Sequence, residues 1–303
     1  MLDTCVAILV LVLIGFLGTR RGLLSEDFSK KASWLVMNVF LPASIFNSIT
    51  DGIGQLSVRQ LPHILLMMTL FVAVSYVFSC LFTLAFGRRA EDPALLELSI
   101  SAMNTLLVGL PILQGVYGSM AVLYTGMSNL PFNFFLYTYG VWRLSSTGPE
   151  HQGGIHLRSM FTLCLGATVL GLLFFCFGIP VPGIAKRFLS FSAGATIPLS
   201  TVIIGITMGK EDIRAAFRDR RVYVVCLVRL IVIPLLVWLA MRPLTADVLL
   251  LKTCVVLAAC PTAVVVPILA LQHGHEPTLG SNSVIVSTIL GLVTMPAIIL
   301  LMG

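Results

Sequence analysis

Apolar runs of about 20 residues recur along the whole chain, separated by short stretches that hold most of the charges. As a helix, a run of that length matches the roughly 30 Å hydrocarbon core of a lipid bilayer. Hydrophobic residues make up 57% of the 303 residues and charged residues only 11%, too few to cover that apolar surface in water. We therefore predict an all-α membrane protein that crosses the bilayer many times.

The apolar runs divide into ten candidate transmembrane helices, and no large soluble domain fits between them. Their approximate limits are 2–19, 33–50, 62–86, 94–115, 120–142, 159–179, 188–209, 222–241, 246–271 and 279–302. The loops after the odd-numbered spans carry most of the 19 Lys and Arg residues. The positive-inside rule then makes these loops cytoplasmic and places both termini outside, on the extracellular or periplasmic side of the plasma or inner membrane.

Charge and cysteine content exclude several other classes of protein. The net charge of +6 comes from basic residues in short loops, where they act as orientation signals, so no nucleic-acid partner is expected. The seven cysteines have neither paired spacing nor a nearby histidine cluster, so we expect no metal, no disulfide framework and no cofactor. Residues 1–10 are interpreted as the start of the first span rather than a removed signal peptide.

The chain also contains an internal repeat. The interval between Pro111 in "LPIL" and Pro267 in "VPIL" equals the interval between Pro42 in "FLPAS" and Pro198 in "TIPLS". This offset divides the chain into residues 1–151 and 152–303, with five spans in each. Because five is odd, the second half enters the membrane from the opposite side, and such inverted repeats are typical of secondary transporters.

Helix breakers occur at related places in the fourth and ninth spans. Gly109 and Pro111 lie in the fourth, and Pro261 and Pro267 lie in the ninth. Proline lacks a backbone N–H and clashes with the carbonyl four residues earlier, and a freed carbonyl is costly in lipid. We expect both spans to be interrupted near Pro111 and Pro267 and to cross there. The N-termini of the resulting half-helices would favour an anion.

Several motifs resemble one family of transporters along nearly the whole chain. "NTLLVGLPILQGVYG" at 104–118 and "AACPTAVVVPILA" at 258–270 resemble the fourth and ninth helices of the auxin efflux carrier family. "VRLIVIPLL" and "STILGLVTMP" resemble its last helices. This family includes plant PIN-type auxin exporters and bacterial permeases for small carboxylates such as malate and malonate. The long central cytoplasmic loop of many plant members is missing here.

The resemblance implies a fold like that of bile-acid symporters and sodium/proton antiporters. Spans 1, 2, 6 and 7 would form a scaffold, and spans 3–5 and 8–10 a transport domain that moves as an elevator. Helices 4 and 9 would cross inside the transport domain, and the protein would form a homodimer. The implied partner is a small carboxylate anion.

The resemblance also assigns roles to individual residues. Asn104 matches an asparagine that contacts the substrate carboxylate, and Pro111, Pro261 and Pro267 match the crossover, with Gly109 and Val266 as its support. Asn129 lies near a family glutamine that contacts substrate. Leu41 falls at an apolar pocket position. Ile45 stands where plant members have serine, with Ser44 just before it, and this departure favours small mono- or dicarboxylates over an indole acid.

Charged residues inside predicted spans are expensive and often functional. Glu97 and Lys252 lie near the starts of spans 4 and 9, and snorkelling to the membrane surface would explain both. Arg229 lies deeper, in span 8. It could snorkel to the cytoplasm, pair with backbone carbonyls of a broken helix, or help to attract an anion.

Other functions remain to be weighed against transport of an anion. An intramembrane enzyme is disfavoured because no HExxH motif or carboxylate pair is present, so no catalytic residue is assigned. A proton antiporter would need an acid near the crossover. A sodium-coupled organic-anion symporter stays open, since backbone carbonyls and Asn or Ser oxygens could bind the ion. A receptor that binds without moving its ligand is the last alternative.

Overall fold

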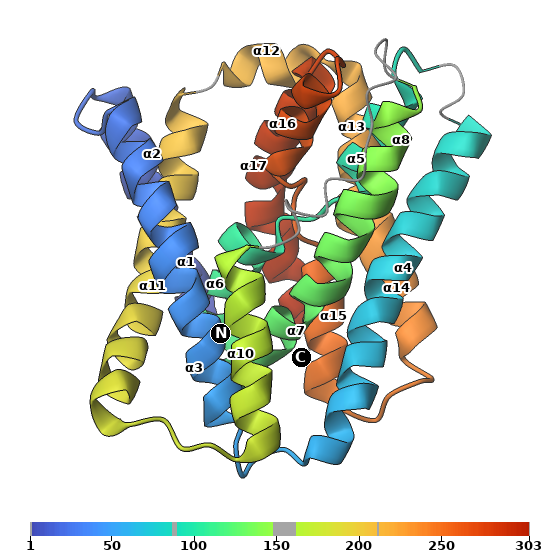
Figure 1. Ribbon diagram of the computed structural model, residues 1–303. Coiled ribbons are helices and arrows are strands. Elements are labelled where there is room, and N and C mark those ends of the chain that lie inside the picture. Colours follow the sequence, from blue (N-terminus) through green and yellow to red (C-terminus); the bar gives the residue numbers. More distant parts are fainter. Residues whose placement is uncertain (1, 87–89, 148–161, 211, 303) are drawn as a thin grey trace. The chain divides into compact units, whose positions relative to one another are not determined.

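The computed structural model describes residues 2–86, 90–147, 162–210 and 212–302 (Figure 1). Within these ranges the chain is helical apart from short connections. Only isolated β-bridges occur there, and no strand forms. The all-α fold class is therefore confirmed for the described part of the chain.

The chain forms two compact units, and each of them draws on both halves of the sequence. The first unit comprises Met1–Met68, Leu106–Leu130 and Phe161–Glu211, and the second comprises Thr69–Thr105, Pro131–Met160 and Asp212–Gly303. The boundaries fall inside helices as well as in loops. The proposed halves 1–151 and 152–303 thus concern the sequence repeat, whereas the units are defined by packing.

Helices of the first unit include two that touch through their backbones. The unit contains α1 (Leu2–Arg20), α2 (Glu26–Leu35), α3 (Leu41–Asp51), α6 (Leu110–Tyr117), α10 (Leu163–Phe177) and α11 (Gly183–Lys210). A Cβ on Gly15 would lie 2.2 Å from the Val202 carbonyl oxygen, and one on Gly205 only 2.0 Å from that of Val12. Glycine at both positions lets α1 and α11 lie side by side, as small residues do in membrane bundles (Figure 1).

The second unit is built around helix α17 (Thr278–Leu301). Its other helices are α5 (Pro93–Ser101), α8 (Val141–Ser145), α12 (Ile213–Arg218), α13 (Arg220–Leu227), α14 (Ile233–Met241), α15 (Val248–Ala258) and α16 (Val265–Gln272). It also holds most of α4 (Leu61–Phe86) and the end of α7 (Ser119–Phe135). Helix α17 packs against α5, α12, α13, α15 and α16.

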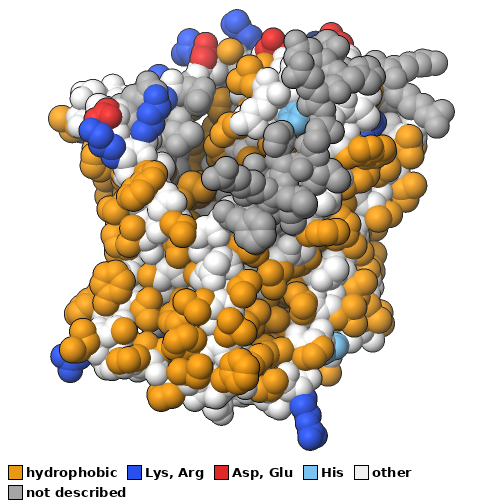
Figure 2. Space-filling view, in the orientation of Figure 1, with side chains coloured by type: hydrophobic (Ala, Val, Ile, Leu, Met, Phe, Trp, Pro, Cys, Tyr) orange, Lys and Arg blue, Asp and Glu red, His pale blue; other side chains and the backbone are white. Residues whose placement is uncertain are grey.

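Helix length and surface chemistry both fit a bilayer. Among the described residues, five helical segments are long and apolar enough to cross a membrane: Asp27–Asp51, Val58–Phe86, Gly183–Lys210, Arg220–Met241 and Thr278–Leu301. Large apolar side chains are exposed on these and other helices, for example Ile14 on α1, Leu170 on α10 and Leu239 on α14. Figure 2 shows how such side chains dominate the face drawn. The chain is a multi-pass membrane protein, and the count of ten spans stays a prediction.

Several prolines produce π-helical turns rather than breaks, which corrects one prediction. The π turns Val36–Phe40, Thr105–Gly109 and Val228–Val232 each precede a helix with proline in its first turn. A wider turn relieves the clash between the proline ring and the carbonyl four residues earlier. Gly109 accordingly keeps helical dihedral angles, φ −65° and ψ −51°, and Pro111 lies inside α6. The fourth span is not broken at Gly109 and Pro111.

Candidate functional site

Two interrupted helices of the second unit pair with each other at their interruptions. Helix α5 ends at Ser101, and Ala102 is extended, with φ −79° and ψ 118°. In the ninth predicted span, α15 ends at Ala258 and α16 begins at Val265. Met103 and Thr262 form an antiparallel bridge between the two irregular stretches. We call the paired stretches Ala102–Asn104 and Pro261–Ala263 the crossover.

Reciprocal backbone hydrogen bonds hold the crossover together. The Asn104 N–H donates to the Pro261 carbonyl at 2.9 Å, and the Ala263 N–H donates to the Ala102 carbonyl at 3.0 Å. Each stretch thus satisfies polar groups that the other leaves outside a helix, as a low-dielectric interior requires. Of the predicted site residues, Asn104 and Pro261 are brought into contact here, and Asn104 lies in the interruption itself.

Thr262 fastens the crossover to two neighbouring helices. Its N–H donates to Ser287 Oγ of α17 at 3.0 Å. Its Oγ1 donates to the Ser99 carbonyl of α5 at 2.8 Å. Both contacts are buried, so the irregular backbone is held on both sides. The "CPT" sequence explains the break in this stretch, because Pro261 cannot continue the hydrogen-bonding pattern of α15.

Arg229 reaches the crossover from the π turn Val228–Val232 and is 0% exposed. Its Nε donates to the Cys260 carbonyl at 2.9 Å. Its Nη1 donates to the carbonyls of Ile100 and Ser101 at 2.8 Å and 3.4 Å. These carbonyls lie at the C-terminal ends of α5 and α15, where the helix dipole is negative. Of the three readings of Arg229, the structure shows pairing with carbonyls of broken helices, not snorkelling.

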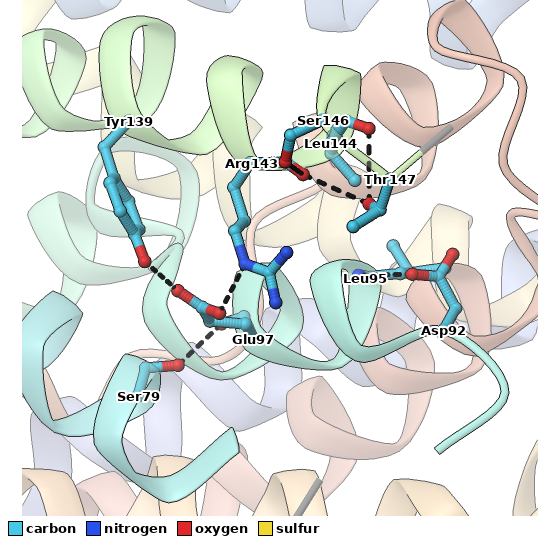
Figure 3. Close-up of polar contacts among 9 residues, drawn as sticks. All are labelled: Ser79, Asp92, Leu95, Glu97, Tyr139, Arg143, Leu144, Ser146 and Thr147. Carbon is cyan, nitrogen blue, oxygen red and sulfur yellow. Dashed lines mark hydrogen bonds and ion pairs between the residues drawn. The ribbon is translucent and has the colours of Figure 1, made fainter. Parts of the chain in front are cut away.

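Glu97 forms a second buried charged centre in the same unit (Figure 3). Its side chain is 2% exposed and accepts hydrogen bonds from Tyr139 Oη and, at 3.0 Å, from Arg143 Nε. Its backbone carbonyl accepts a bond from Ser79 Oγ at 2.7 Å. Glu97 is therefore an internally paired carboxylate, and the interpretation that it snorkels to the membrane surface is wrong.

A third charged contact joins the start of α5 to the segment after α16. Asp92 caps α5 by accepting the Leu95 N–H at 2.9 Å (Figure 3). Its other carboxylate oxygen lies 2.5 Å from His275 Nδ1. His275 Nε2 lies 2.9 Å from the Leu144 carbonyl oxygen. Sequence reasoning missed this contact, because Asp92 and His275 are far apart along the chain.

The remaining predicted site residues of the second unit lie on α15 and α16. Val266 is fully buried and, with Pro267, faces Gly280 of α17, where a Cβ would lie 3.3 Å from Val266 Cγ1. Pro267 falls in the first turn of α16, so the chain is already helical there. Lys252 is partly buried on α15.

The predicted pocket residues Leu41, Ser44, Ile45 and Asn129 belong to the first unit and are buried there. Leu41, Ser44 and Ile45 lie on α3, and Ser44 Oγ is 3.5 Å from Gln114 Oε1 of α6. Ile45 packs on α7, because a Cβ on Gly126 would lie 2.8 Å from its Cγ2. Asn129 is 1% exposed on the same helix.

Apolar helices and two interrupted helices that pair in mid-segment are features of membrane transport proteins. The comparison with protein families gives the same class, since residues 1–154 and 154–299 match the family described as membrane transport protein. The chain belongs to this family, the auxin efflux carrier family that its motifs resemble.

Similar proteins come from archaea and bacteria. An "Uncharacterized transporter" of Methanothermobacter thermautotrophicus is 29% identical over 309 residues, which cover 97% of this chain and 96% of the relative. "Uncharacterized transporter YfdV" of Escherichia coli is 24% identical, with 95% and 93% covered. "Uncharacterized transporter MJ1031" of Methanocaldococcus jannaschii is 24% identical over 70% of each chain. The similarity to YfdV and to the Methanothermobacter relative thus extends over nearly the whole length.

Proposed function

We propose that this protein is a secondary transporter of a small organic anion and that the anion binds at the crossover. The observation that carries the proposal is the pairing of Asn104 with Pro261 beside the buried Arg229. Interrupted helices in secondary transporters mark substrate sites, because their ends expose backbone polar groups inside the membrane. Membership of a transport family supports the same function.

The chemistry of the crossover suits a carboxylate. The N-terminus of α16 follows the crossover directly, and a helix N-terminus favours an anion. Arg229 adds a positive charge to the same region. The Asn104 side chain would donate to one carboxylate oxygen. Ile45, which stands where plant members of the family have serine, favours a short mono- or dicarboxylate such as malonate or malate over an indole acid.

The transport cycle would use elevator-type alternating access. Spans 3–5 and 8–10 would move as a transport domain against a scaffold of spans 1, 2, 6 and 7, in a homodimer. Five spans per half would make the two halves inverted repeats, with both termini outside the cytoplasm. A cysteine placed at the C-terminus should then react with an impermeant thiol reagent added to intact cells.

Binding followed by flux tests the function directly. Purified protein should bind malonate, malate or indole-3-acetate in a calorimetric screen. The same protein in liposomes should take up the radiolabelled form of whichever compound binds, at a rate above that of empty liposomes. Binding without uptake would indicate a receptor, and the absence of both for all three carboxylates would contradict the proposed substrate class.

A further inference from the structure

A buried histidine away from the crossover joins three elements of the second unit. His275 follows helix α16 and is 9% exposed. Its Nδ1 lies 2.5 Å from Oδ2 of Asp92, the N-cap of α5, and its Nε2 lies 2.9 Å from the Leu144 carbonyl oxygen of α8. The three helices also pack on one another. The histidine therefore fixes the start of α5 against the ends of α8 and α16.

The two contacts of His275 require one proton more than a neutral imidazole and an ionised carboxylate contain. A carbonyl oxygen can only accept a hydrogen bond, so the contact to Leu144 needs a hydrogen on Nε2. In a neutral imidazole Nδ1 is then a bare acceptor, and it faces a second acceptor, Asp92 Oδ2. A further proton must lie between these two atoms, on the imidazole or on the carboxyl group. Either tautomer of the neutral ring keeps one of the two contacts but not both.

The other charged or titratable side chains at this end of the unit are engaged elsewhere among the described residues. Their partners are as follows: Glu91 bonds Arg221, Glu97 bonds Tyr139 and Arg143, His273 bonds the Leu269 carbonyl, and Glu276 bonds Thr278. Helix α17, which packs on α16 and α5, contains no charged residue. Asp92 is thus the carboxylate that shares the proton with His275.

We propose that Asp92 and His275 form a proton-binding latch, which joins α5 to the end of α16 while it holds its proton and opens as the pH rises. Imidazole titrates close to neutral pH, so a change within the physiological range operates the latch. Helix α5 runs from the latch to the crossover, and α16 runs from the crossover back to the latch. In the proposed topology the latch faces the cytoplasm and senses its pH. The latch itself does not rest on the proposed function, whereas its effect on substrate binding does.

The pH dependence of stability tests the latch without any substrate. His275→Gln keeps an N–H donor for the Leu144 carbonyl but cannot take up the proton. The thermal unfolding midpoint of the purified wild type should exceed that of the variant by about 2–4 °C near pH ~6, and the difference should largely disappear near pH ~8.5. Comparing the two proteins at each pH cancels the titration of all other groups.

Two further variants make the result specific. Glu91→Gln is the matched control, because Glu91 directly precedes Asp92 and its partner Arg221 stays protonated over this pH range. Its difference from the wild type should be the same at both pH values. Asp92→Asn keeps a good N-cap, should reproduce the pH dependence of His275→Gln, and takes its place if that variant does not fold. A difference from the wild type that stays constant, or grows, as the pH rises would overturn the latch.

Malonate binding separates this inference from the proposed function. A closed latch preorganises the two half-helices that meet at the crossover, so the wild type should bind malonate a few-fold more tightly than His275→Gln near pH ~6 and equally well near pH ~8.5. If no carboxylate binds but the stability difference depends on pH, the proposed function fails and the latch stands. If malonate binds and the ratio of the two affinities does not change with pH, the latch has no role in binding and that part of the inference is overturned.

Discussion

Arg229 and Glu97 are both charged side chains buried in the second unit, yet their surroundings differ in kind. Glu97 has a cationic partner, Arg143, and a hydroxyl donor, Tyr139, so its charge is neutralised locally. Within the described residues, the hydrogen bonds of Arg229 go to backbone carbonyl oxygens and none goes to a carboxylate. A neutralised buried pair serves the architecture, whereas a buried charge without an opposite charge is expensive unless something else, such as a substrate anion, compensates it.

The largest expected effect on stability comes from breaking the neutralised centre. Glu97→Leu leaves Arg143 without its carboxylate, and because removing one partner of a buried pair is costly, the free energy of unfolding should fall by about 3 kcal/mol. Unfolding in detergent measures this loss, and the double variant Glu97→Leu/Arg143→Leu should recover much of it. Malonate affinity of the folded single variant should stay unchanged. A loss of malonate affinity in the folded variant would instead place Glu97 in the binding site.

The next effect concerns affinity at the crossover. Asn104→Ala should weaken malonate binding by about 10- to 150-fold, since a hydrogen bond to a charged partner contributes roughly 1.5–3 kcal/mol. Asn104→Asp should be worse, because it places a like charge against the anion. Calorimetry on the folded variants provides the measurement, with Asn282→Ala, whose side chain bonds Asp219, as the control. Lower thermal stability with unaltered affinity would restrict Asn104 to supporting the crossover backbone.

Sequence patterns predicted the helical class and the pair of interrupted segments but misplaced one interruption. In the ninth span, Pro261 lies in the break itself, so the sequence predicts the position of this break correctly. In the fourth span, the stretch Ala102–Asn104 contains no breaker, and its extended form depends on pairing with Pro261–Ala263. That pairing is a tertiary interaction, so local propensity pointed instead to Gly109 and Pro111, where the chain only widens into a π turn.

The buried charges were recognised individually, but their partners were not. Glu97 and Arg229 stood out because charges are rare in apolar spans. Tyr139 and Arg229 lie inside the π turns Leu136–Gly140 and Val228–Val232, and Arg143 follows the first of these turns. A π turn changes the direction in which its own and the following side chains point, and no sequence signal marks the first turn. The pairing of Glu97 with Tyr139 and Arg143 therefore could not be derived from helical periodicity.

A smaller effect should follow from changes at the third charged contact, between Asp92 and His275. Asp92→Ala removes both the N-cap of α5 and the partner of His275 Nδ1, so the free energy of unfolding should fall by about 1–2 kcal/mol. Asp92→Asn retains a good N-cap and should lose less. The difference in thermal stability between the two variants measures the contribution of the N-cap. Equal losses would show that the contact with His275, rather than the cap, stabilises this end of the helix.

The smallest effect is expected outside the spans, where solvent screens charges. Hydrogen bonds from the Arg221 side chain hold the pKa of the Asp219 carboxyl below its usual value, and Asp219 also caps α13. A depressed pKa means that this contribution to stability is fully present above the ordinary Asp pKa of about 4 and is lost as the pH falls through the lower folded-state pKa. Because Arg221 is partly exposed, the contribution should be below about 1 kcal/mol at neutral pH. Asp219→Asn keeps a capping residue, so the variant should be slightly less stable than the wild type at pH 7 and equally stable at strongly acidic pH. If the stability difference between the two proteins persists unchanged under acid, the charge of Asp219 contributes nothing to stability. The buried Glu97 pair would then differ even more from this screened surface pair in its contribution to the free energy of unfolding.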